Sequence, residues 1–175
     1  MGIIPPINFK KWIDENRHLL KPPVGNQVVY TDTDFIVMVV GGPNARKDFH
    51  FNKGEEFFYQ IEGDMHLPIR ENGKTRLIEI KEGEIFLLPP GVEHSPQRKA
   101  NTVGMVIERV RNEDELDACT WYCENCDQEL YKANFHCKDI VNQLPLLINS
   151  FYEDVKLRTC KHCSSIMEVP TLKVN

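Results

Sequence analysis

Two histidines and a glutamate stand at the ends of short strand-like runs near the middle of this chain. His50 and Glu56 lie six residues apart, before an apolar–polar alternation that ends at Gly63. His94 completes a Gly-x5-Pro-x-Gly-x2-His pattern that begins at Gly83. Two neutral imidazoles and one carboxylate are the ligand set of non-haem Fe(II) oxygenases, which keep coordination positions open. Spacing alone does not establish that the three side chains converge, and a lone histidine is more often an ordinary polar residue.

A second group of metal-binding residue types lies in the C-terminal third. Cys123-x2-Cys126 and Cys160-x2-Cys163 each suit a knuckle that gives two thiolates to one tetrahedral ion. A shell of four thiolates leaves no open position, so this site is predicted to be structural and to hold Zn²⁺ or iron, between which spacing does not decide. Two disulfides are the alternative, which a reducing compartment disfavours.

The region that would position the first group is predicted to be mainly β. Turn sequences separate seven β-rich runs, at 28–30, 35–40, 56–61, 65–70, 75–80, 85–88 and 103–110. Asn72-Gly73 is the strongest turn signal, because both residues tolerate the positive φ of a two-residue hairpin. Helices do not alternate with these runs, so we expect an antiparallel sandwich or small barrel.

Helical patterns flank the β region. A helix is predicted over 9–20, with Asn8 as its N-cap and Pro22-Pro23 as its end. A second helix is predicted over 144–157, with Pro145 in its first turn.

The length of 175 residues allows one domain of ordinary size with a small appendage. The charged connector 111–115 suggests the division. We expect an N-terminal helix plus barrel over 1–111 and an extension with the four-cysteine site over 112–175.

Composition excludes several classes of partner. The net charge is −5 and the lysines and arginines are scattered, which disfavours a nucleic-acid surface. No stretch approaches the roughly 20 apolar residues of a membrane span, and the start of the chain lacks the apolar run of a signal peptide. A cytoplasmic protein is expected.

Residues 27–111 resemble the cupin family. The second cupin motif is matched by Gly83, Pro89, Gly91 and His94, and the latter part of the first by His50, Glu56 and Gly63. Two positions depart from the usual pattern: Asn52 stands where many cupins have another histidine, and Arg98 replaces an asparagine at the end of the second motif. The resemblance implies a double-stranded β-helix, or jelly-roll, barrel.

The departures resemble one branch of the cupins, the 3-hydroxyanthranilate 3,4-dioxygenases. Similar segments are 40–46, 56–60, 94–98 and 106–108, together with the N-terminal helix and the paired Cys-x2-Cys tail of the bacterial and fungal form. The resemblance implies extradiol-type cleavage of 3-hydroxyanthranilate by O2. The product would be 2-amino-3-carboxymuconate semialdehyde, on the kynurenine route to quinolinate and NAD. A homodimer is also implied.

Site roles follow from this resemblance. His50, Glu56 and His94 would hold catalytic Fe(II), and Asn52 in place of a further histidine would leave room for the hydroxyl and amino groups of the substrate and for oxygen. Arg46 and Arg98 would hold the substrate carboxylate, since a guanidinium meets a carboxylate with paired hydrogen bonds. Either arginine could equally be a surface charge.

Two further pocket residues are implied. Glu108 shares strand parity with Val106, so its carboxylate is expected to point into the barrel, where it would accept a hydrogen bond or proton from the substrate. A structural salt bridge to one of the two arginines is the alternative. Asn26 would approach oxygen or substrate.

Two other functions stay open for the sequence. One is a different cupin oxygenase or isomerase, for example a thiol dioxygenase. The other is a non-catalytic cupin that binds a small ligand or a protein, which would hold no iron at the His50 site.

Overall fold

The strands of the computed structural model, which describes residues 3–21 and 25–171, pair antiparallel and confirm the predicted mainly β architecture. They are β1 (Asn26–Val28), β2 (Phe35–Gly41), β3 (Asp48–Phe51), β4 (Glu56–Glu62), β5 (Met65–Glu71), β6 (Lys74–Ile80), β7 (Ile85–Leu88), β8 (Gln97–Arg98), β9 (Val103–Arg109), β10 (Asp117–Tyr122) and β11 (Glu129–Phe135). In the described part of the chain they form a five-stranded sheet, β1-β2-β9-β4-β7, and two three-stranded sheets, β11-β10-β3 and β6-β5-β8.

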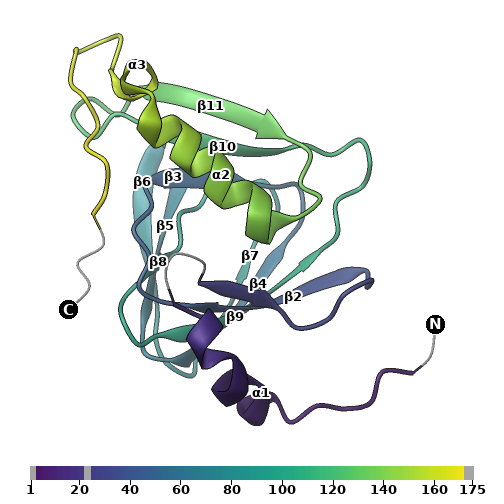
Figure 1. The fold of residues 1–175 in the computed structure, drawn as a ribbon. Helices are drawn as coiled ribbons and strands as arrows, with labels where there is room; N and C mark the ends of the chain where they lie inside the picture. Colours follow the sequence, from purple (N-terminus) through teal and green to yellow (C-terminus); the bar gives the residue numbers. More distant parts are fainter. Residues whose placement is uncertain (1–2, 22–24, 172–175) are drawn as a thin grey trace.

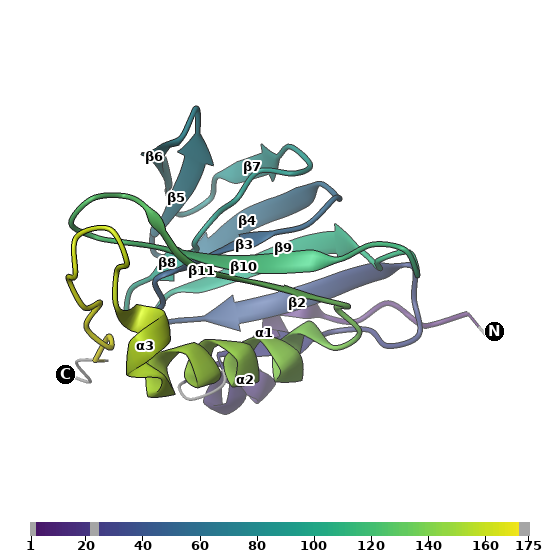
Figure 2. The ribbon, with the colours of Figure 1, turned by 90° about the horizontal axis from the view of Figure 1, so that it is seen from above.

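The two three-stranded sheets meet at His94. Its backbone forms an antiparallel bridge with His50 of β3 and another with Ile69 of β5. The resulting wall faces the five-stranded sheet, as the ribbon in Figure 2 shows from above, and buried side chains fill the space between them. The predicted Asn72-Gly73 turn is confirmed between β5 and β6, where both residues have positive φ, 51° and 74°.

Strand alternation decides which side chains enter this interior. Along β4 buried and half-buried residues alternate, so Glu56, Phe58 and Gln60 face inward. Each lies opposite an inward residue of β9, namely Glu108, Val106 and Gly104. The inner face therefore has two ends, a carboxylate end at Glu56 and a glycine end at Gly104.

Helix α1 (Phe9–Asn16) covers part of the outer face of the five-stranded sheet. The side chain of Asn8 accepts a hydrogen bond from Lys11 N, which confirms the predicted N-cap. A 3-10 turn, η1 (Arg17–Leu19), follows, and Ile13 and Leu20 pack against Val39. The predicted end at Pro22-Pro23 lies outside the described residues.

The chain after residue 111 joins the barrel wall. β10 pairs with β3 and β11 pairs with β10. Helix α2 (Ile140–Glu153) packs against β10 and contacts β1, as can be followed in Figure 1, and the short helix α3 (Val155–Arg158) follows it. The division at residue 111 stays a prediction, since β10 continues the sheet of β3 without a break.

Some element boundaries differ from those predicted. β1 begins and ends two residues before the predicted run at 28–30. α2 starts at Ile140 because Asp139 caps it, so Pro145 lies in the second turn and not the first. Sequence patterns missed β3, β8, β10 and β11. β3 and β8 are short, and β10 and β11 are not bounded by the Gly and Pro turns that mark the predicted strands.

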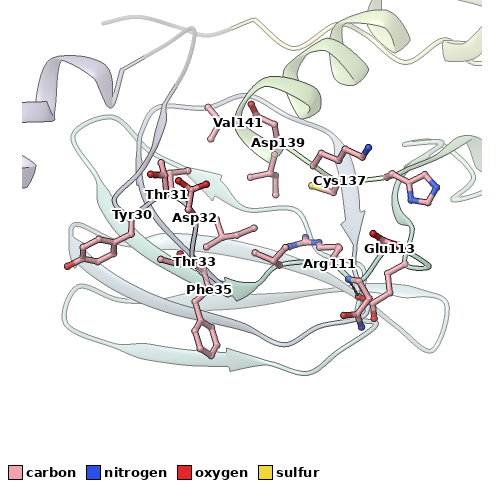
Figure 3. A pocket seen from close by; sticks show the side chains of 18 residues that line it. Tyr30, Thr31, Asp32, Thr33, Phe35, Arg111, Glu113, Cys137, Asp139 and Val141 are labelled. Atoms are coloured by element: carbon pink, nitrogen blue, oxygen red, sulfur yellow. Dashed lines mark hydrogen bonds between the residues drawn. The ribbon is translucent and has the colours of Figure 1, made fainter. Parts of the chain in front are cut away.

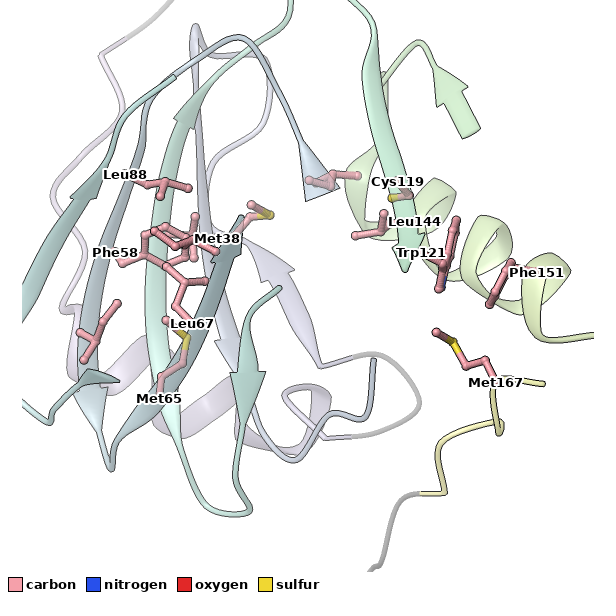
Figure 4. Packing of buried hydrophobic residues seen from close by; sticks show 14 residues of the cluster. Met38, Phe58, Met65, Leu67, Leu88, Cys119, Trp121, Leu144, Phe151 and Met167 are labelled. Atoms are coloured by element: carbon pink, nitrogen blue, oxygen red, sulfur yellow. The ribbon is translucent and has the colours of Figure 1, made fainter. Parts of the chain in front are cut away.

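The main hydrophobic core continues from the barrel into the space beneath α2. Figure 4 shows one group inside the barrel, around Phe58 and Leu67, and another between β10 and α2, where Trp121 stacks on Phe151 with ring centroids 4.2 Å apart. The C-terminal segment is therefore part of the packing that holds the barrel. No helix within residues 3–21 and 25–171 is both long and apolar enough to cross a membrane.

Candidate metal centre and substrate-binding wall

The side chains of His50, Glu56 and His94 converge inside the barrel. The bridge between β3 and the loop before β8 sets the two histidines side by side, with both backbone hydrogen bonds formed at 2.8 and 2.9 Å. Oε1 of Glu56 lies 3.1 Å from Nε2 of His94 and 3.7 Å from Nδ1 of His50. All three residues are buried, and their candidate ligand atoms lie within 4.8 Å of one another.

This donor set fits a divalent transition metal. Although burial opposes it, the neighbouring histidines lower the pKa of Glu56, so that carboxylate is an anion at neutral pH. Burial also opposes the charged form of His50, but hydrogen bonds to Asp117 and Glu56 raise its pKa to about 9. A cation among these groups would replace the proton on His50 and satisfy the Glu56 carboxylate. Two imidazoles and one carboxylate would leave the remaining metal positions to ligands from outside the protein.

Asn52 occupies the position where many cupins have a further histidine. Its Nδ2 donates to Oε1 of Glu56 at 2.5 Å and lies 3.5 Å from Oε2 of Glu108, while its Oδ1 accepts from Gly54 N at 2.6 Å. The amide thus separates two buried carboxylates and is held by the turn that follows it. It has no nitrogen lone pair to offer a metal.

Glu108 points into the barrel, as strand parity predicts. It lies opposite Glu56 in the register of β9 with β4. Its ion-pair partner is Arg111, with Nη1 3.0 Å from Oε2, and neither Arg46 nor Arg98 as the structural alternative supposed. Within the described residues, its Oε1 has no hydrogen-bond partner. Glu108 therefore keeps one acceptor atom free in the interior.

Arg98 is a buried arginine at the glycine end of the inner face. It is 4 % exposed, Nη1 donates to Oε1 of Gln60 at 3.0 Å, and Nε has no partner in the described part of the chain. No carboxylate among residues 3–21 and 25–171 pairs with it, and burial lowers its pKa to about 10. A Cβ at position 104 would come within 2.5 Å of the guanidinium, so Gly104 provides its space. A buried cation without a counter-ion is a site for an anion.

Arg46 and Asn26 are the two remaining residues of the predicted substrate site. The guanidinium of Arg46 is paired through Nε and Nη2 with the buried carboxylate of Asp48. Asn26 lies on β1 in register with Val40 and is half-buried, and no hydrogen bond of its side chain occurs in the described residues. The structure thus places Glu108 on the same sheet as Glu56, and Arg98 reaches the inner face of that sheet from β8 through its contact with Gln60, while Arg46 has a partner of its own.

A pocket of about 750 Å³ opens beside this wall, between the end of β1, the connector after β9 and the start of α2. Figure 3 shows Arg111, Cys137 and Asp139 along it, with Tyr30 and Thr31 across from them. The three converging residues are not part of its lining. Arg111 is the link, because it lines the pocket and contacts Glu108 of the inner face.

The four cysteines form a separate cluster. Sγ of Cys123 lies 3.6 Å from that of Cys163, and Cys126 and Cys160 are also 3.6 Å apart. A disulfide would require about 2.05 Å. Thiolates about 2.3 Å from one tetrahedral ion would lie about 3.8 Å from one another, close to the observed distances. The cluster therefore fits one metal ion, as the spacing predicts, and not two disulfides.

Sequence reasoning missed several polar residues of the interior. Asp117 accepts from Nε2 of His50 at 2.8 Å, and Arg111 donates to Asp117. Arg111 lies in the charged run 111–115, which predicts a connector, and no turn sequence marks β10, which carries Asp117. Apolar and aromatic residues in 117–122 were the available signal for that strand.

Comparisons with known proteins agree with the resemblance. Residues 1–152 match the family model described as 3-hydroxyanthranilic acid dioxygenase. A protein named 3-hydroxyanthranilate 3,4-dioxygenase from Xanthomonas oryzae pv. oryzae is 51 % identical over 96 % of this chain and 95 % of its own. One of the same name from Bacillus cereus is 48 % identical over 91 % of this chain and 90 % of its own. A cupin-2 domain protein from Shewanella frigidimarina is 24 % identical over 59 % of this chain and 93 % of its own, with a TM-score of 0.47.

Proposed function

Because the chain belongs to the 3-hydroxyanthranilic acid dioxygenase family, we propose that it opens the ring of 3-hydroxyanthranilate with O2 in an iron-dependent reaction. The product would be 2-amino-3-carboxymuconate semialdehyde, which cyclises to quinolinate on the kynurenine route to NAD. The buried guanidinium of Arg98 carries the proposal. Within the described residues it is a cation without a carboxylate partner that faces the strands of Glu56 and Glu108 from β8, and the substrate would supply the missing carboxylate.

In this proposal His50, Glu56 and His94 hold Fe(II), which supplies the redox chemistry between ring and oxygen. Arg98 receives the substrate carboxylate through paired charge-assisted hydrogen bonds. Gln60 of the Arg98 end lies four residues along β4 from Glu56, which is about 13 Å of strand. The carboxylate, amino and hydroxyl groups of 3-hydroxyanthranilate stand on three adjacent ring carbons, so one edge of the substrate carries both the metal-binding groups and the carboxylate that Arg98 would receive.

Glu108 has the free acceptor atom that a substrate hydroxyl or amino proton needs. Burial and the negative charge of Glu56 raise its pKa, which favours proton acceptance. Arg46 would assist Arg98 through the N–H groups that Asp48 does not use, and Asn26 would face the oxygen or substrate from β1. Positioning by these groups lowers the entropic part of the barrier.

The direct test is anaerobic loading with Fe(II), followed by 3-hydroxyanthranilate and air. We expect one semialdehyde or quinolinate per substrate consumed, measured by absorbance and mass spectrometry. The variant His50→Ala should lose the inner metal and turnover while retaining the metal at the four cysteines. No product from the loaded protein would refute the proposal, and turnover of a thiol substrate instead would favour a different cupin oxygenase.

We also propose a homodimer formed through the outer face of the five-stranded sheet. Beyond the area covered by α1, this face exposes Phe35, Ile85 and Leu87, which are each more than half exposed. Contiguous apolar patches of this kind mark protein interfaces. Light scattering should give a dimer for the wild type and a monomer for Leu87→Asp, with Leu77→Asp on β6 as the exposed control. A monomeric wild type would refute it.

A cytoplasmic location is proposed from the cysteine cluster. Four thiolates that share one ion require a compartment in which they stay reduced. Thiol alkylation in intact cells followed by mass spectrometry should find no disulfide among Cys123, Cys126, Cys160 and Cys163. Oxidised pairs would place the protein elsewhere.

A further inference from the structure

Asp117 is a buried carboxylate for which the mechanism above has no role. It is 1 % exposed, and its carboxylate accepts hydrogen bonds from His50 and Arg111. Nε2 of His50 lies 2.8 Å from Oδ2, and Nη2 of Arg111 lies 2.7 Å from the same oxygen, while Nε of Arg111 lies 2.9 Å from Oδ1. A buried ion pair adds little net stability over apolar residues of the same size. Its contact with a proposed metal ligand suggests another purpose.

The strand register explains how Asp117 reaches His50. His50 of β3 lies opposite Cys119 of β10 in the antiparallel pairing. Asp117 is two residues from Cys119 and therefore on the same face, diagonal to His50 and within side-chain reach. The C-terminal segment thus contributes a group to the interior of the barrel through backbone pairing alone.

The contact selects one nitrogen of His50. A metal-binding imidazole is neutral, and its single N–H resides on the nitrogen that does not bind the metal. A carboxylate that accepts this N–H fixes the tautomer and the ring orientation. Nε2 faces Asp117, so the remaining nitrogen, Nδ1, is the one that faces Glu56.

Arg111 holds this carboxylate and a second one. Its Nε and Nη2 grip Asp117, while Nη1 lies 3.0 Å from Oε2 of Glu108 and donates to the backbone oxygen of Arg109. A planar guanidinium fixes both carboxylates in one geometry, which a lysine would not do. The hydrogen-bonded chain runs from His50 through Asp117 and Arg111 to Glu108.

We propose that Asp117, held by Arg111, is a positioning residue for the metal ligand His50. The same guanidinium also fixes the position of the Glu108 carboxylate. This inference rests on the proposed metal site. It assigns to the C-terminal segment a part in building the catalytic centre, besides its own four-cysteine cluster.

The test compares Asp117→Asn with the wild type and with Glu115→Gln as a matched control. Glu115 is also a buried carboxylate, in the same connector region, and is paired with Arg109 and not with His50. The side chain of Asp117→Asn is neutral and therefore a weaker acceptor for the Nε2–H of His50 and for Arg111. Fe(II) affinity, measured anaerobically by chelator competition, should fall about 10- to 100-fold. The control should stay within about twofold of wild type, and both variants should retain the metal of the cysteine cluster.

A spectroscopic readout separates positioning from simple stabilisation. The electron paramagnetic resonance spectrum of the nitric oxide adduct of the Fe(II) protein should change for Asp117→Asn and not for Glu115→Gln. Unchanged affinity and an unchanged spectrum would overturn the inference. Turnover by the wild type is scored separately, so failure of the proposed reaction is distinguishable from failure of this inference.

A measurement on the wild type covers the case in which Asp117→Asn does not fold. Long-range ¹H–¹⁵N NMR of the Zn²⁺-loaded protein identifies the protonated nitrogen of each histidine. We expect His50 to carry its proton on Nε2. A proton on Nδ1 would overturn the inference without any substitution.

Discussion

Glu56 on β4 and Glu108 on β9 stand directly opposite each other in antiparallel register, and both carboxylates are buried. Their surroundings separate them. The histidines lower the pKa of Glu56 despite its burial, whereas burial and Glu56 itself raise the pKa of Glu108 against the opposing effect of Arg111. When the pKa values of two neighbouring carboxyl groups are driven apart in this way, one group stays an anion and the other can accept a proton.

Glu108→Gln tests this division. The substitution keeps the shape but removes the proton acceptor, so kcat should fall by at least about 100-fold. It also removes a buried like charge opposite Glu56, so the free energy of unfolding of the metal-free protein should not decrease. Steady-state kinetics and urea unfolding measure the two effects. Glu55→Gln, at the exposed neighbouring position, is the control, and an unchanged kcat for Glu108→Gln would exclude a role in proton transfer.

Arg98→Met should separate binding from stability. Loss of charge-assisted hydrogen bonds worth roughly 1.5–3 kcal/mol should weaken 3-hydroxyanthranilate binding about 10- to 150-fold. Because the guanidinium is buried and has no carboxylate partner among the described residues, a similar-sized apolar side chain should leave the melting temperature unchanged or higher. Anaerobic calorimetric titration and thermal unfolding provide the measurements. Arg76→Met, at an exposed arginine on β6, should alter neither the substrate affinity nor the melting temperature. If Arg98→Met binds the substrate as tightly as wild type does, Arg98 is not part of the substrate site.

Cys126→Ser should remove the metal of the cysteine cluster without emptying the His50 site. The cluster anchors the segment that places Met167 in the core beside Trp121 and Phe151. Burial of a methionine is worth about 1.5–3 kcal/mol, so a destabilisation of at least about 2 kcal/mol is expected.

Metal analysis and hydrogen exchange over residues 158–167 measure these effects. Cys137→Ser, which lies outside the cluster, should retain the metal. Loss of turnover by Cys126→Ser with normal iron content and a normal fold would contradict a structural role for the cluster.

Stability should depend on the protonation of Glu62. Arg17 donates to both oxygens of Glu62, at 2.7 and 2.8 Å, which lowers the pKa of this carboxyl and ties η1 to β4. A lowered folded-state pKa gives stability that is present above the unfolded value near 4.5 and is lost as pH falls through the folded value.

The free energy of unfolding of the wild type should therefore exceed that of Glu62→Gln by less than about 1 kcal/mol at pH 7, since the pair is exposed. The difference should become smaller as pH falls below about 4.5 in a urea-unfolding series between pH 3.5 and 7. A difference that stays constant across this series would exclude the ion pair as its cause.

Local sequence determined much of this protein. The alternating pattern determined which residues of β4 and β9 face inward, and Asn72-Gly73 determined the position of a hairpin turn. The two Cys-x2-Cys pairs predicted the cluster of four cysteines. These features depend on neighbours within a few residues, or on a ligand spacing that the backbone alone satisfies. The inward direction of Glu108 was predictable for the same reason, whereas the convergence of His50, Glu56 and His94 was implied by the family resemblance and not by spacing.

Only the tertiary structure decided the partners of the buried charges. Arg46 is paired with Asp48, Arg111 joins Glu108 to Asp117, and Asp117 reaches His50, whereas Arg98 has no carboxylate partner in the part of the chain that the structure describes. The contact between His50 and Asp117 depends on the register of β10 with β3 and joins residues that are 67 apart in sequence. The types and spacing of charged residues do not predict such pairing. Inside a barrel every inward side chain has several possible partners, and packing selects among them.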